Sequence, residues 1–152
     1  MNFTCPVVRT APTTLVVHCS DPRFQLAFCC FIPRELDNFR QAVPIVVPGG
    51  PAPLANPMMA REKQVLEGQI IFFLKHFPSI KLVALINHED CGFYKEISNP
   101  TGRENRERED TPIAAQAVAG RIASEGIEGV KVAAFYARFD NIDESKISFE
   151  EM

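Results

Sequence analysis

The chain has 152 residues and a formal charge of −3, with 46% apolar and 23% charged residues. These values are typical of a globular protein and exclude collagen-like, mucin-like and disordered classes. A chain of this length is expected to fold as a single domain over residues 1–152 and to bury about 70% of its unfolded surface. The mild acidity argues against nucleic-acid binding, and the longest apolar run, residues 26–32, is too short to span a membrane.

The first 14 residues lack the charged and then apolar pattern of a secretory signal peptide. The five cysteines are odd in number and include no C-x-x-C pair, so they do not form the pattern of a disulfide framework. We therefore expect a cytoplasmic protein with reduced cysteines. Cys29 and Cys30 fall within an apolar run and are predicted to be buried in the core, whereas Cys5 is predicted to be a free thiol near the N-terminus.

In chain order, the first predicted strand is residues 15–17, and an apolar helix follows at residues 24–32 and ends near Pro33. A second strand is predicted at residues 43–47. It is closed by the Pro-Gly-Gly-Pro segment 48–51, which lacks the lysine and hydroxyl residue of a P-loop. We expect this segment to form a turn that lines a crevice.

The next predicted helix begins at Asn56-Pro57, an N-cap followed by a first-turn proline, and stops at Pro78. The continuously apolar run 82–86 is typical of a strand that is covered on both faces. The mixed-charge segment 99–110 is predicted to be a solvated loop or frayed helix, with a regulatory or partner-binding loop as the alternative.

A last helix is predicted from Thr111-Pro112 to Gly126, then a strand at residues 130–137 and a short edge strand at 147–149. Strands that alternate with helices form parallel βαβ units. The predicted fold class is therefore α/β, with an open, mostly parallel sheet of four to five strands and helices on both faces.

Two predicted strands are followed by side chains that bind metals. Cys19 follows the first strand, and His88 and Cys91 follow the third. The carboxyl ends of parallel strands line the ligand crevice of an open α/β sheet, so the three side chains converge if these strands are neighbours. Two thiolates and a neutral imidazole are good zinc ligands and leave a fourth position open. The sequence predicts a zinc site at these residues.

Asp21 and Arg23 follow Cys19 closely, and a bidentate pair between them would keep the carboxylate ionised and oriented toward a metal-bound hydroxide. Gly92 is predicted to allow close packing behind the metal. His18 should point away from Cys19, across the strand. His76 is predicted to be structural, near a helix C-terminus. Taken singly, each candidate has a plainer interpretation as a packed thiol, a loop histidine or a surface ion pair. Their combination favours a metal site.

The segments CSDPR at residues 19–23 and HEDCG at residues 88–92 resemble the C-x-D-x-R and H-x-x-C-G motifs of the beta-class carbonic anhydrases. The resemblance implies zinc held by Cys19, His88 and Cys91, with Asp21 and Arg23 as a catalytic dyad. It implies reversible hydration of carbon dioxide to bicarbonate by zinc-bound hydroxide. It also implies a homodimer with substrate clefts along the subunit interface, and the Gly92 amide is expected to orient bicarbonate.

The sequence also departs from this family. Pro22 stands where members usually carry serine, and residues 47–51 replace an Arg-Asn-rich stretch. Two alternatives follow from these departures: a zinc hydrolase of carbonyl sulfide or carbon disulfide, and a zinc-stabilised binding module without turnover. Whether Asp21 or water occupies the fourth zinc position is left open by the sequence.

Overall fold

The computed structural model describes residues 4–5, 7, 9–37, 42–97, 105–143 and 145–152. A five-stranded sheet in the order β2-β1-β3-β4-β5 forms its centre. The first four strands are parallel, and β5 pairs antiparallel with β4 at one edge. This arrangement confirms the predicted open, mostly parallel sheet. The strands are β1 (Thr14–Cys19), β2 (Val43–Val47), β3 (Leu82–His88), β4 (Lys131–Phe139) and β5 (Ile147–Glu151).

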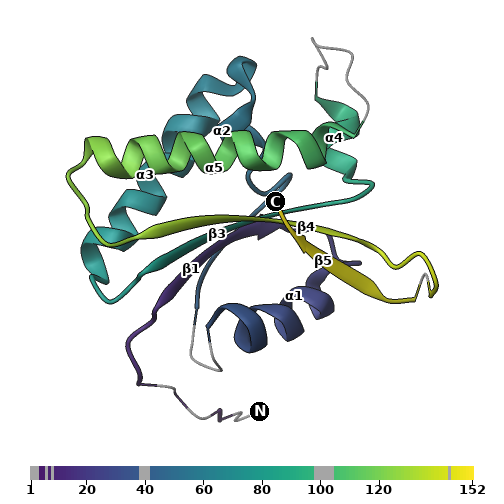
Figure 1. Cartoon of the computed structure of the whole chain (residues 1–152), viewed down its shortest axis with the longest axis horizontal. Helices are drawn as coiled ribbons and strands as arrows, with labels where there is room; N and C mark the ends of the chain where they lie inside the picture. The colour runs from purple at the N-terminus through teal and green to yellow at the C-terminus, as the bar shows by residue number, and fades with distance from the viewer. Residues whose placement is uncertain (1–3, 6, 8, 38–41, 98–104, 144) are drawn as a thin grey trace.

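Helices cover both faces of this sheet, as predicted. Figure 1 shows α2, α3 and α5 on one face and α1 on the other. In the described part of the chain, no helix has both the length and the apolar character that crossing a membrane requires. The helices are α1 (Gln25–Phe31), α2 (Ala52–Ala55), α3 (Ala60–His76), α4 (Gly92–Glu96) and α5 (Arg106–Ser124).

The core is divided by the sheet because successive strand residues point to opposite faces. Leu15 and Val17 of β1 pack into the cluster beneath α3 and α5. Val16, between them, packs with Phe24 and Phe28 on the α1 face. Both faces of the central strands are therefore buried, which explains why their sequences are continuously apolar.

The start of the long helix α3 follows the prediction. Asn56 caps the chain, and its side-chain oxygen accepts a hydrogen bond of 3.0 Å from the amide of Met58. A single 3₁₀ turn, Pro57–Met59, leads into α3, which ends at His76, shortly before Pro78.

The predicted start of α5 at Thr111 is wrong, because the helix begins at Arg106 and contains Pro112 in its interior. Its first turns are held by buried polar side chains: Arg106 is 6% exposed and Asp110 is 1% exposed. The Arg106 guanidinium lies 5.5 Å from the centre of the Tyr94 ring. Residues 106–110 are therefore not a solvated loop, and residues 98–104 lie outside the described residues.

One prediction about α1 is also wrong. Cys29 and Cys30 are exposed, because the helix turns Phe28 into the core and these neighbouring positions outward. The α-helix itself ends at Phe31, close to the predicted end near Pro33, and a π-helical turn, Ile32–Leu36, follows it. Cys5 is exposed and free, as predicted.

Gly50 is required by its surroundings. Its φ of +53° is left-handed, and a Cβ atom there would lie 2.9 Å from the backbone nitrogen of Cys19. We predict that Gly50→Ala lowers the free energy of unfolding by about 1–3 kcal/mol, measured by urea denaturation. Gly120→Ala is the matched control, because a Cβ at this exposed α5 position meets nothing within 4 Å. It should raise stability by about 0.5–1 kcal/mol, and equal effects of the two changes would contradict this account of Gly50.

Candidate metal centre

The candidate site lies where the strand order reverses. The chain leaves β1 for β2 on one side, and β3 lies on the other side of β1. Strands β1 and β3 pair in parallel, from Thr14 opposite Leu82 to His18 opposite Ile86. Their carboxyl ends therefore meet at one edge, which is where open α/β sheets bind ligands.

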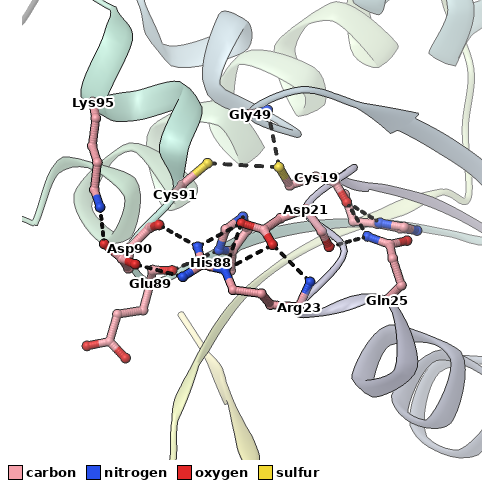
Figure 2. Close-up of polar contacts among 11 residues, drawn as sticks. Cys19, Asp21, Arg23, Gln25, Gly49, His88, Glu89, Asp90, Cys91 and Lys95 are labelled. Atoms are coloured by element: carbon pink, nitrogen blue, oxygen red, sulfur yellow. Dashed lines mark hydrogen bonds and ion pairs between the residues drawn. The ribbon is translucent and has the colours of Figure 1, made fainter.

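The structure brings the three predicted ligands together at this edge. The ligand atoms of Cys19, His88 and Cys91 all lie within 4.8 Å of one another. The two sulfurs are 3.9 Å apart, as Figure 2 shows. The residues are 4%, 0% and 2% exposed. This is the spacing and burial that a single metal ion needs, and zinc binding itself stays a prediction.

His88 is oriented for ligation by the backbone carbonyl of the next residue. Its Nδ1 donates a hydrogen bond of 2.8 Å to the carbonyl oxygen of Glu89. Its Nε2 is buried and has no hydrogen-bond partner among the described residues. A buried polar atom without a partner costs about 1–3 kcal/mol. A metal ion would satisfy this nitrogen, and the fixed tautomer leaves its lone pair free, as in known metal sites.

The two thiols share a proton. The Cys91 thiol donates to Cys19 and so lowers the pKa of Cys19 below its usual range, with help from the Gly49 amide, which lies 3.3 Å from the sulfur. The same hydrogen bond to Cys19, together with burial, raises the pKa of Cys91. Cys19 is therefore the more acidic thiol, and we expect the metal-free pair to hold one proton near neutral pH.

Asp21 and Arg23 form the predicted ion pair beside this cluster. The Arg23 Nε lies 3.1 Å from Oδ1 and its terminal nitrogen 2.8 Å from Oδ2 of Asp21. These hydrogen bonds lower the pKa of Asp21, so its carboxylate is ionised. Its Oδ2 lies 4.0 Å from Nε2 of His88 and therefore borders the candidate metal position. Gln25 holds this loop by donating to the carbonyls of Cys19 and Asp21 at 3.0 and 2.8 Å.

The segment 48–51 forms the predicted turn next to the site. Its importance for Cys19 was not predicted: Gly49 donates its amide to the sulfur, and Gly50 lies against the β1 backbone. The Gly-Gly pair in the sequence predicted the turn. It did not indicate that the turn would contact the sulfur of Cys19. The predicted packing role of Gly92 is wrong, since a Cβ there would meet nothing within 4 Å.

The other two histidines lie outside the cluster. His18 packs against the Phe28 ring at 4.6 Å on the α1 face, and its Nδ1 donates to the carbonyl of Cys19 at 2.9 Å. His76 is exposed in the last turn of α3 and stacks on Phe72 at 5.6 Å.

A buried polar network supports the site from behind. Asn87 donates to the hydroxyl of Tyr94 at 3.2 Å and to that of Thr111 at 3.0 Å. Tyr94 packs in the same cluster as Cys19 and Cys91. Strand β3, helix α4 and helix α5 are therefore joined directly behind the candidate ligands. Sequence analysis missed this network because its members are separated along the chain.

The molecule is thus an α/β protein with a Cys-His-Cys cluster at the reversal of its strand order. No family model and no curated protein sequence matches the chain. Its fold is similar to that of a solved structure, beta-carbonic anhydrase isoform I from the Trichomonas vaginalis protozoan. The TM-score is 0.54 at 12% identity, over 96% of this chain and 87% of that one.

Two fungal beta-carbonic anhydrases are also similar. The Aspergillus fumigatus enzyme CafA has a TM-score of 0.48 at 13% identity, over 93% of this chain and 76% of that one. A structure from the work on two tetrameric enzymes of Sordaria macrospora has a TM-score of 0.40 at 15% identity, over 91% of this chain and 80% of that one.

The shared proton leads to a prediction about metal binding. Zinc takes both sulfurs as thiolates, so its binding at pH 7.5 should release about one proton from the pair, and zinc affinity should rise about tenfold per pH unit. Calorimetric titrations in buffers of different ionisation enthalpy measure the number of protons released. Cys91→Ser is the control, expected to bind zinc more weakly without this proton release. Release of two protons from the wild-type pair would show that Cys19 and Cys91 do not share one.

Proposed function

We propose that this chain is a single zinc-binding domain that catalyses the reversible hydration of carbon dioxide to bicarbonate. The observation that carries the proposal is the buried cluster of Cys19, His88 and Cys91, whose unpartnered imidazole nitrogen lies 4.0 Å from the ionised carboxylate of Asp21. The fold, which resembles that of a beta-carbonic anhydrase, supports it. The five cysteines are free thiols, which suits the reducing cytoplasm that we propose for this protein.

The donor set suits zinc. Two thiolates balance the charge of a divalent ion, so the buried site carries little uncompensated charge. A bound zinc ion supplies a Lewis acid, which in sites of this kind lowers the pKa of water toward about 7 and so provides a nucleophile near neutral pH. Cys19, His88 and Cys91 would hold the ion.

Asp21 and Arg23 would orient the attacking water. The carboxylate accepts its hydrogen bond, which directs the oxygen lone pair toward the carbon of the substrate. Arg23 keeps Asp21 ionised and holds both of its oxygens in a fixed position. We assign the Gly92 amide, in the first turn of α4, as a donor to an oxygen of bicarbonate.

An apolar cavity of about 420 Å³ lies beside these loops. Its lining is mostly apolar and includes Pro48 and Phe93, the chain neighbours of Gly49 and Gly92. Its polar members are Arg61, Glu62 and Gln69. The apolar part of this wall suits a small, uncharged gas. We propose that carbon dioxide approaches the site from this side.

The role of Asp21 can be tested by stopped-flow hydration assays on zinc-loaded protein. Asp21→Ala is expected to lower kcat/KM about 100-fold or more, because the water loses its hydrogen-bond acceptor. Asp143→Asn removes an exposed carboxylate that pairs with Lys146, and it should leave the rate unchanged. Equal rates for the wild type and Asp21→Ala would contradict the mechanism. A zinc-loaded wild type at the background rate would favour the non-catalytic binding module.

We further propose a homodimer that covers an apolar stripe on α3. Val65 and Phe72 are 57% and 59% exposed, and Met58, just before the helix, is 73% exposed. Val65 and Phe72 lie seven residues apart within α3 and so face the same side of the helix. Val65 also lines the cavity, so a second subunit on this face would form part of the cavity wall.

Sedimentation velocity tests this assembly. Val65→Glu is expected to convert a wild-type dimer into monomers, because the new carboxylate would be buried without a partner. Leu26→Glu is the matched control, since Leu26 is 77% exposed on α1, across the sheet. A dimer that persists in Val65→Glu, or dissociates only in Leu26→Glu, would place the interface elsewhere.

A further inference from the structure

Arg23 joins the two loops that carry the candidate ligands. Besides its bonds to Asp21, the guanidinium donates to Oδ2 of Asp90 and to the backbone carbonyl of Asp90, both at 2.8 Å. Asp90 is 67 residues further along the chain, between His88 and Cys91. Figure 2 shows the Arg23 side chain extending between these loops. A single side chain therefore links the end of β1 to the turn after β3.

Asp90 also sets the path of that turn. Its φ is +56°, in the left-handed region that residues other than glycine, asparagine and aspartate seldom adopt. Such conformations persist where the surroundings hold them, and they concentrate at functional sites. Here the left-handed residue immediately precedes Cys91, at the reversal between β3 and α4.

Lys95 of α4 forms a second ion pair with Asp90 on the side away from Arg23. Asp21, Arg23, Asp90 and Lys95 thus form a row of alternating charge across the edge of the site. Isolated exposed ion pairs contribute little to stability, but multiple hydrogen bonds from one guanidinium fix geometry as well as charge. The contacts of Asp90 are therefore expected to affect the position of Cys91 more than the free energy of unfolding.

We propose that Asp90 is a positioning residue that, through Arg23, holds the Cys91 loop against the Cys19 loop in the arrangement that binds zinc. This inference rests on the proposed zinc site and concerns a residue whose carboxylate contacts Arg23 and Lys95, outside the candidate ligand cluster. Removing a partner that orients metal ligands indirectly commonly weakens metal affinity by about 10–100-fold. For Asp90, we expect the lower end of that range.

Zinc affinity, measured by competition with a chelating dye, tests this role. Asp90→Asn removes the charge but keeps a residue that tolerates the left-handed conformation, and we expect affinity to fall about tenfold. Asp90→Gly, which also tolerates this backbone, should show the same loss. Melting of the metal-free variants should change little. Cobalt substitution should retain thiolate-to-metal absorption in both variants, since Cys19 and Cys91 remain.

A double-mutant cycle with Arg23→Gln separates this role from a general structural one. If Asp90 acts through Arg23, the double variant loses no more zinc affinity than Arg23→Gln alone. Asp143→Asn, which removes an exposed carboxylate elsewhere, should bind zinc as the wild type does. Unchanged affinity in Asp90→Asn, or additive losses in the cycle, would overturn the inference.

The outcome is distinguishable from failure of the proposed reaction. A wild type that binds zinc and loses affinity in Asp90→Asn, but never hydrates carbon dioxide, would support the positioning role and overturn only the reaction. A wild type that binds no zinc would overturn both.

Discussion

The parallel pairing of β1 with β3 is the constraint on which the site depends. This pairing places the end of β1 beside the end of β3, so that Cys19 meets two residues that are distant in the chain. A register shift of one residue would turn Cys19 to the opposite face of the sheet. The register is specified by burial on both faces, since Leu15 and Val17 belong to one core and Val16 to the other. The packing of the core therefore determines the geometry of the cluster.

The charged groups at the edge of the cluster complement its buried centre. The thiols and the imidazole are nearly inaccessible to solvent, whereas Arg23 and Asp90 are partly exposed. Water can therefore hydrate the charges of the ion pairs and weaken them, whereas it has little access to the candidate metal ligands. Burial strengthens the electrostatic interactions of the candidate ligands, and the exposed ion pairs orient the loops that carry them. This difference follows from the lower effective dielectric constant of the protein interior. Asp21, less exposed than its partner, lies at the boundary between them.

The sheet and the candidate ligands could be predicted because their signals are local. Apolar runs indicated the strands, and the cysteine and histidine positions at two strand ends indicated a shared edge. Cys29 and Cys30 show the limit of composition, since their run is apolar but the helical period turns both outward. Pro112 lies inside α5 because buried side chains hold the turns before it, which a start signal at Thr111 could not show. The left-handed φ of Asp90 depends on contacts far along the chain and gave no local signal.

The separation of the candidate ligands has a consequence for the order of assembly. Cys19 and Cys91 are 72 residues apart, whereas His88 and Cys91 share one turn. An unfolded chain would have to close this long loop to bring all three ligands to one ion, at a considerable cost in entropy. Unlike a zinc finger, whose folding requires the ion, this protein has an extensive core on both faces of its sheet that contains none of the candidate ligands. Metal is therefore expected to arrive after the polypeptide has folded, as the last component to be inserted.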